Sequence, residues 1–231
     1  MSDQAGTIDR PNLNELVAEH IKRQIFEGAL GPGEKIGEDD VAKSMGTSRT
    51  PVKIALSELA KEGLVELIPR RGAFVRKFSH NDIIELSEIR RAFEGLAGRL
   101  SARYIEPGRL DRLEELNNTY GDCVVQLADP NVSCDETVRR TKELDLAFHR
   151  TILESTGNRH LAMLMGLNSI GFLSFLYEQP IDPISTVKRT KAEHEEIIEA
   201  LRARKENLAE QLLQRHIMRA IEVLEESDHD E

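Results

Sequence analysis

The sequence predicts a mostly α protein in two parts: an N-terminal part in which helices precede a β-hairpin, and a C-terminal part that is all-α. Two observations predict this fold class. Apolar residues recur at helical spacing along most of the 231 residues. Between residues 64 and 77, however, two short runs of β-type residues flank a Pro-Arg-Arg-Gly turn. We therefore expect a domain boundary after residue 77.

Three helices are expected in the N-terminal part, after a disordered segment at residues 1–10. A stripe of apolar residues predicts the first helix, and Gly46 ends the second. Thr47 or Ser48 caps the third, which has Pro51 in its first turn, where a missing N–H costs nothing. The three helices are expected at about 12–26, 38–45 and 49–62.

A β-hairpin is expected to follow the third helix. Its strands are residues 64–68 and 73–77, and the tight turn at 69–72 connects them. A short helix, a tight turn and a second helix form a helix-turn-helix, and the hairpin after it adds a wing. We therefore expect residues 11–77 to form a winged helix-turn-helix.

The C-terminal part, residues 78–231, is expected to be an all-α six-helix bundle. Segments such as Pro107-Gly108 and Gly157-Asn158 separate its helices. These are expected at about 80–105, 107–128, 135–156, 159–178, 183–203 and 205–227. No apolar run approaches the about 20 residues that a membrane helix needs, and the polar N-terminus does not resemble a signal peptide. We expect no membrane contact and a cytoplasmic location.

Charge is distributed unevenly along the chain. The formal net charge is −10, and residues 78–231 carry all of it, because residues 1–77 hold 12 basic and 12 acidic residues. Within residues 49–77 there are 7 basic and 3 acidic residues. A local basic patch can contact phosphate while an acidic remainder repels non-specific binding. The acidic total therefore does not exclude a nucleic-acid partner.

The third predicted helix divides into an apolar and a polar face. The apolar face fits a small core and consists of Val52, Ala55, Leu56 and Leu59. Arg49, Thr50 and Lys53 lie on the other face, near the N-terminal end that enters the major groove in helix-turn-helix proteins. Such side chains can donate to guanine or contact a base edge. The pattern favours DNA reading, with a solvated helix face as the alternative.

The turn of the hairpin carries further positive charge. Arg70 and Arg71 lie at its tip, beside Gly72. Two arginines on a wing suit contacts to the DNA backbone or the minor groove. The alternative is that they only increase solubility.

Three predicted helices of the C-terminal part place metal-ligand residue types on apolar faces. Asp145 and His149 are four residues apart and share a face with Phe148 and Ile152. His194 and His216 each lie within an apolar stripe. Burying four such groups unpaired would be costly, and one metal ion satisfies all of them. From the pattern alone, a metal site and hydrogen-bonded core histidines both stay open.

The N-terminal part resembles the GntR family of regulators. The resemblance rests on Met45-Gly-Thr-Ser-Arg-Thr-Pro-Val-Lys-Ile-Ala-Leu, Glu62-Gly-Leu-Val and Pro69-Arg-Arg-Gly-Ala-Phe-Val75. It implies DNA contacts at Arg49, Thr50, Lys53 and the wing around Gly72. Two positions depart from the family: Lys53 stands where arginine is commoner, and Asp39 stands where some members place an arginine on DNA. No DNA contact is assigned to Asp39.

The C-terminal part resembles the FCD ligand-binding domain of one GntR branch. The resemblance rests on Glu88-Ile-Arg90, Phe93-Glu94, Asp145-Leu-Ala-Phe-His149, Gly157-Asn158, His194 and His216. Six helices rather than seven resemble the vanillate-regulator-like subgroup. The resemblance implies a homodimer and a divalent transition metal at Asp145, His149, His194 and His216. It also implies a small carboxylate effector that Arg90 helps to hold, where the alternative role of Arg90 is an ion pair with a nearby glutamate.

These expectations combine into a repressor that binds a palindromic operator as a homodimer and responds to an organic acid. We expect zinc at the metal site, while nickel, manganese and iron also suit three imidazoles and a carboxylate. A metal-dependent hydrolase or lyase is the main rival, although the sequence has no HExxH-type signature and we expect no enzyme. A purely structural metal is the third alternative.

Overall fold

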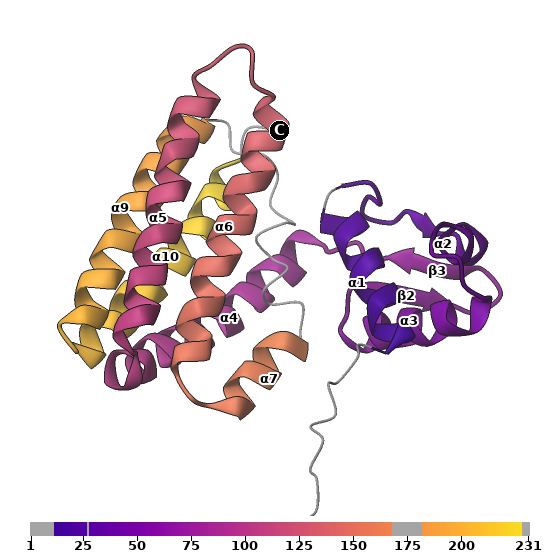
Figure 1. Cartoon of the computed structure of the whole chain (residues 1–231), viewed down its shortest axis with the longest axis horizontal. Coiled ribbons are helices and arrows are strands. Elements are labelled where there is room, and N and C mark those ends of the chain that lie inside the picture. Colours follow the sequence, from indigo (N-terminus) through magenta and orange to yellow (C-terminus); the bar gives the residue numbers. More distant parts are fainter. Residues whose placement is uncertain (1–11, 27, 168–181, 228–231) are drawn as a thin grey trace, which may run out of the picture. The chain divides into compact units, whose positions relative to one another are not determined.

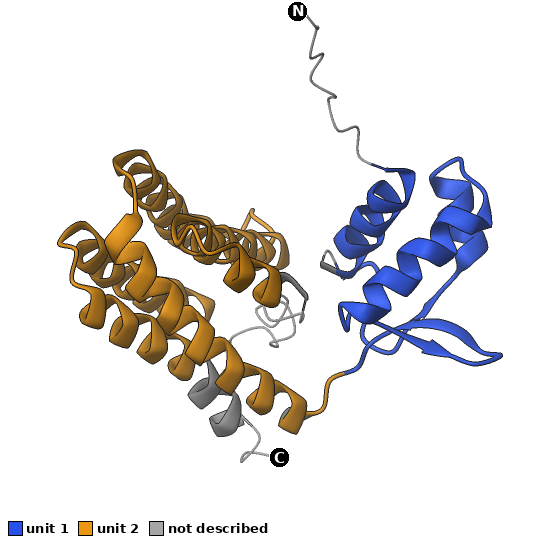
Figure 2. Cartoon of the chain, turned by 90° about the horizontal axis from the view of Figure 1, so that it is seen from below, with its two compact units in different colours: residues 1–77 blue, residues 78–231 orange. Residues whose placement is uncertain are grey.

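The computed structural model describes residues 12–26, 28–167 and 182–227 (Figure 1). The expected disorder at residues 1–10 lies outside the described residues. The chain forms two compact units, residues 1–77 and 78–231, drawn in different colours in Figure 2.

The first unit contains the helices and the hairpin that the sequence predicts. Its elements are α1 (Leu13–Phe26), β1 (Lys35–Ile36), α2 (Glu38–Ser44), α3 (Arg49–Lys61), β2 (Val65–Ile68) and β3 (Gly72–Val75). Between α2 and α3 the chain turns tightly at Gly46, which has a φ of 61° that residues with a Cβ rarely adopt. Ser48 stands at the N-cap of α3, but its side chain makes no capping hydrogen bond.

The sheet has a third strand that the sequence analysis missed. β2 and β3 form the expected antiparallel hairpin, and β1 pairs with the other edge of β3, so that the strand order is β1-β3-β2. Ile36 of β1 lies opposite Ala73 and is buried. A two-residue strand has no periodicity to recognise, because its pairing depends only on its partner.

The core of the first unit confirms the apolar face predicted for α3. Val52, Ala55, Leu56 and Leu59 are fully buried, and they pack beside α1, α2 and the sheet. Since this face points into the core, the opposite face of α3 is the one left for solvent or a partner.

The second unit is a bundle of helices. Its described helices are α4 (His80–Tyr104), α5 (Pro107–Leu127), α6 (Cys134–Ser155), α7 (Arg159–Leu167), α9 (Pro183–Arg202) and α10 (Glu206–Ser227). Ser79 begins α4 with a capping box to Asp82, and proline begins α5 and α9. The part of the expected helix 159–178 beyond Leu167 lies outside the described residues, so the subgroup assignment from helix number stays a prediction.

Close packing of α4 against α10 fixes one side of the bundle. A Cβ atom at Gly98 would lie 2.9 Å from the backbone oxygen of Ala209, so only glycine allows this approach. α5 packs against both α6 and α9. The shared core includes Phe148, Ile152, Ile197 and Leu213 from α6, α9 and α10. This packing brings the inner faces of α4, α6, α9 and α10 to one place.

Candidate functional site

The exposed face of α3 carries the residues predicted to read DNA. Arg49, Thr50 and Lys53 are all exposed, on the face opposite the core and at the N-terminal end of the helix. Ile54 is 40% exposed on the same face, which the sequence analysis did not single out. An elongated apolar side chain among polar ones would suit a thymine methyl group.

Both basic side chains of this face have acidic neighbours on α2. The guanidinium of Arg49 donates from Nε and Nη2 to the two carboxylate oxygens of Asp39. The Nζ atom of Lys53 lies 3.9 Å from Oε2 of Glu38. All four side chains are at least partly exposed, so these ion pairs add little to the stability of the fold.

The wing places its two arginines at the turn between β2 and β3. Arg70 and Arg71 are exposed, and Arg70 adopts a left-handed backbone conformation with a φ of 63°. The guanidinium of Arg71 lies 5.5 Å from the centre of the Phe74 ring. Gly72, the first residue of β3, has a φ of 107°, which favours glycine. This turn is therefore a defined, positively charged tip.

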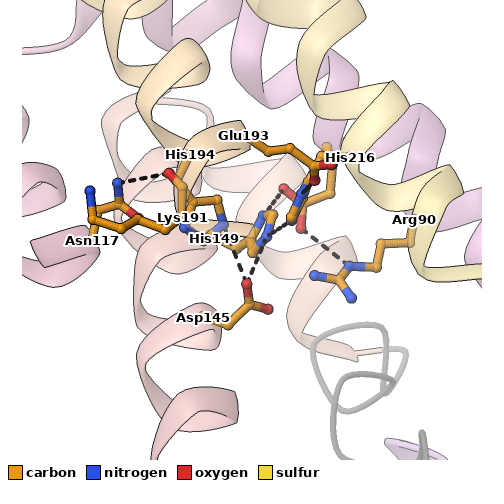
Figure 3. Close-up of polar contacts among 9 residues, drawn as sticks. Arg90, Asn117, Asp145, His149, Lys191, Glu193, His194 and His216 are labelled. Atoms are coloured by element: carbon orange, nitrogen blue, oxygen red, sulfur yellow. Dashed lines mark hydrogen bonds and ion pairs between the residues drawn. The ribbon is translucent and has the colours of Figure 1, made fainter. Parts of the chain in front are cut away.

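In the second unit, the four predicted metal ligands come together. Asp145 and His149 extend from α6, His194 from α9 and His216 from α10 (Figure 3). One ligand atom from each residue can be chosen so that all four lie within 4.8 Å of one another. The three histidines are buried and Asp145 is half-buried. Three helices that are separate in sequence thus supply one compact donor set.

The distances within this cluster suit a bound transition metal. The Nε2 atoms of His149 and His216 are 3.2 Å apart. Two imidazoles bound tetrahedrally to zinc at about 2.0–2.1 Å place their nitrogens about 3.3 Å apart. The Oδ1 atom of Asp145 lies 3.4 Å from Nε2 of His194 and 3.8 Å from Nε2 of His149.

The environment of His194 fits that of a metal ligand. His194 is 1% exposed, its Nδ1 makes no hydrogen bond to a described residue, and its Nε2 has only the long contact of 3.4 Å to Oδ1 of Asp145. Its ring stacks on Phe148 at a centroid distance of 3.8 Å, which fixes the plane of the imidazole. A buried imidazole without a hydrogen bond is costly. A metal ion between His194 and its neighbours would remove that cost.

Two further carboxylates, which the sequence analysis did not identify as part of the site, orient two of these histidines. Nδ1 of His149 donates to Oε2 of Glu94 at 3.0 Å, and Nδ1 of His216 donates to Oε2 of Glu193 at 2.7 Å. A hydrogen bond at Nδ1 selects the tautomer that leaves the Nε2 lone pair for a metal. Both Nε2 atoms point to the shared centre (Figure 3).

Each of these carboxylates is in turn paired with an arginine. Arg90 Nε lies 3.4 Å from Oε1 of Glu94, and Arg219 Nη1 donates to Oε1 of Glu193. Arg90 is 3% exposed. The ion pair with a glutamate, which was the alternative role for Arg90, is therefore present in the structure. Its role in holding an effector stays a prediction.

The electrostatics of the cluster favour ionised carboxylates and a neutral His194. Burial raises the pKa of Glu94, but the charges of His149 and Arg90 outweigh it and lower the pKa to about 2. Burial likewise raises the pKa of Glu193, but its hydrogen bonds to His216 and Arg219 outweigh that effect and lower the pKa to about 2. Burial lowers the pKa of His194 to about 4. At neutral pH the carboxylates are charged and His194 is neutral.

Comparisons with known proteins match both units. Residues 13–75 match the gntR family of bacterial regulatory proteins, and residues 85–219 match the FCD domain. The chain is 29% identical, over 94% of its length and 91% of the relative's, to a probable D-xylose utilization operon transcriptional repressor of Paenarthrobacter nicotinovorans. It is 26% identical to the transcriptional repressor RspR of Escherichia coli, over 89% of this chain and 86% of that protein.

Solved structures share the fold. Escherichia coli McbR/YncC superposes with a TM-score of 0.78 at 21% identity, over 94% of this chain and 99% of that one. A regulator described as GntR from Rhodococcus gives a TM-score of 0.73 at 23% identity, over 91% and 97% of the two chains. Among the described residues, no helix is long and apolar enough to cross a membrane.

Proposed function

The chain belongs to the GntR family of bacterial regulatory proteins and carries an FCD domain. From this premise we propose that the protein is a repressor, and that a small organic acid bound at a metal site controls its affinity for the operator. That the chain is a DNA-binding transcriptional regulator, and not an enzyme, follows from the family and from its relatives. The prediction that it is no enzyme is thereby confirmed. The operator contacts, the metal, the effector and the dimer are our proposal.

For DNA, we propose that α3 enters the major groove and the wing contacts the backbone or the minor groove. The observation that carries this proposal is the exposed N-terminal face of α3, where Arg49, Thr50 and Lys53 lie opposite the core. Arg70, Arg71 and Gly72 form the wing contact. A homodimer would present two such heads to a palindromic operator. A DNA partner would also agree with the cytoplasmic location that we propose.

For the effector domain, the donor set would hold one divalent transition metal ion, and zinc is the ion we favour. Asp145, His149, His194 and His216 would be its ligands. The observation that carries this part is the buried His194, whose Nδ1 lacks a hydrogen bond to any described residue and whose Nε2 faces Asp145 at 3.4 Å. When bound, the ion supplies a Lewis-acidic position at which a carboxylate can bind.

Arg90 links the metal site to the proposed effector. Its guanidinium already pairs with one carboxylate, that of Glu94, and Glu94 accepts a hydrogen bond from His149. A second carboxylate, on a small acid beside the metal, would find in Arg90 a planar donor suited to bidentate binding. Any acid that lowers operator affinity must itself bind more weakly to the operator-bound protein, because the two affinities are coupled.

Thermal unfolding with a panel of acids tests the effector site. The metal-loaded protein is heated with each of a set of small mono-, di- and hydroxycarboxylates, and the measurement is repeated with His194→Ala and with His160→Ala, an exposed histidine on α7. We expect at least one acid to raise Tm in the parent and in His160→Ala, but not in His194→Ala. If chelation lowers Tm and no acid raises it, the metal is structural and the effector proposal is wrong.

A further inference from the structure

We propose that Asp39 is a positioning residue for DNA reading, which holds the guanidinium of Arg49 so that one defined edge faces a guanine. The inference rests on the proposed function, in which Arg49 contacts a base edge. Asp39 lies on α2, and it is a position at which the sequence implied no DNA contact.

The pairing between the two side chains is bidentate. Asp39 accepts from Nε and from Nη2 of Arg49, with one carboxylate oxygen for each. These two bonds use one edge of the planar guanidinium, which has five N–H donors in a fixed fork. The neighbouring edge, formed by Nη1 and Nη2, is the fork whose two donors match O6 and N7 of guanine. The pair therefore fixes both the plane of Arg49 and the edge that it presents.

We expect the pair of Asp39 and Arg49 to affect DNA binding and not the stability of the free protein. The side chains of Arg49 and Asp39 are 62% and 65% exposed, so the pair adds little to the free energy of folding. An arginine that is already held in place loses less side-chain freedom when it meets a base. The carboxylate also repels the phosphates of every DNA sequence, which weakens sequence-independent binding. Both effects raise the ratio of specific to random DNA binding.

The neighbouring acid Asp40 provides a matched control. It is exposed and lies in the same first turn of α2 as Asp39, so both carboxylates interact similarly with the helix N-terminus. Its carboxylate lies beside Gly37, just before α2, whereas the carboxylate of Asp39 binds Arg49 of α3. Removing Asp40 therefore removes the same charge from the same turn but leaves Arg49 held.

The test measures specificity with defined duplexes. A duplex enriched from a random library by the parent protein serves as the probe, and random-sequence duplex is the competitor, at one fixed salt concentration. Dissociation constants are measured for the parent, Asp39→Ala, Asp40→Ala and Arg49→Ala. The probe is also made with 7-deazaguanine, which lacks N7, at each guanine in turn.

We expect Asp39→Ala to lower the ratio of specific to random binding about tenfold, and to reduce the penalty of 7-deazaguanine at one guanine of each half-site. Asp40→Ala should strengthen binding to both duplexes equally and keep the ratio. The inference is overturned if Asp39→Ala and Asp40→Ala behave alike while Arg49→Ala collapses the ratio. If Arg49→Ala also keeps the ratio and the 7-deazaguanine penalty, the base contact of Arg49 itself is wrong, and the inference falls with it.

Discussion

At the scale of single residues, the histidine cluster is organised by carboxylates that do not themselves belong to the donor set. Glu94 and Glu193 each bind the Nδ1 atom of one histidine, and each is paired with an arginine. His194 has no such carboxylate at Nδ1 and is held by stacking on Phe148. The three imidazoles are therefore fixed in two different ways.

The first prediction concerns Glu193. Glu193→Gln keeps the size of the side chain but weakens the hydrogen bond that orients His216, so we expect metal affinity to fall by about 10-fold to 100-fold. Competition with a chromophoric chelator measures the affinity. Glu196→Gln on the same helix is the control, because Glu196 is exposed and pairs with Arg215 outside the cluster. Equal affinities for the two variants would contradict an orienting role for Glu193.

The second prediction concerns the stability of the metal-free protein in acid. The pKa of His194 is lowered by burial from 6.5 to about 4, so protonating it costs folding free energy. Stability that is fully present above pH 6.5 should be lost progressively as the pH falls to about 4, by about 3 kcal/mol in total. Glu94 and Glu193, with pKa values of about 2, add a further loss below pH 4.5.

Denaturant unfolding in the presence of a chelator, between pH 7 and pH 4.5, measures this loss. His194→Phe keeps a ring stacked on Phe148 but cannot be protonated, so its free energy of unfolding should change less over that range. A pH dependence as steep as that of the parent would show that His194 is not the group responsible.

At the scale of the helices, the contact between α4 and α10 positions both sides of the cluster. α4 carries Arg90 and Glu94, and α10 carries His216. The close approach at Gly98 sets the separation of the two helices, because any side chain there would meet the backbone of Ala209. Packing about one helical turn from Glu94 thus helps to set the geometry of the cluster.

The third prediction is that Gly98→Ala destabilises the protein by about 1–3 kcal/mol, because the added methyl group overpacks this contact. Replacing a helical glycine by alanine usually stabilises a protein, by up to about 1 kcal/mol. Gly108→Ala, in α5, is the matched control, since nothing lies within 4 Å of its added Cβ. Denaturant unfolding compares the two, and the signs should be opposite. A stabilising Gly98→Ala would show that α10 can move aside at little cost.

The fourth prediction concerns DNA binding by the wing. Replacing both Arg70 and Arg71 by alanine should weaken binding to all DNA sequences alike, because phosphate contacts carry no sequence information. If both arginines neutralise phosphates, the slope of log affinity against log salt should become shallower by about 2. Lys61→Ala removes an exposed positive charge from the far end of α3 and is expected to leave the slope unchanged. A change of sequence preference in the wing variant would indicate base contacts instead.

At the scale of the whole molecule, the two units differ in net charge. The first unit is balanced, and the second carries the entire net charge of −10. The acidic charge of the second unit reduces the attraction of the protein to arbitrary DNA, which makes binding more dependent on the contacts proposed for α3 and the wing.

The fifth prediction follows from linkage between the two units. The acid that raises Tm should lower operator affinity by some factor, and saturating operator should lower the affinity for that acid by the same factor. Fluorescence anisotropy measures the first quantity and calorimetry the second. A factor of 1 in both experiments, for an acid that demonstrably binds, would contradict effector control of the operator.

The sequence alone determined most of the secondary structure and the residue types of both candidate sites. Local signals sufficed for this: apolar periodicity for the helices, a Pro-Arg-Arg-Gly turn for the hairpin, and single histidines within apolar stripes for the cluster. Asp145 and His149 were recognisable together, because four residues along a helix share a face.

Only the tertiary structure decided which groups meet. The strand β1, the carboxylates of Glu94 and Glu193 and the pairing of Asp39 with Arg49 all depend on partners on other elements. Glu193 illustrates the reason, because it directly precedes His194 on α9, and adjacent residues of a helix point in different directions. Its contact with His216 exists only because α9 and α10 pack side by side, and no local pattern in the sequence encodes that packing.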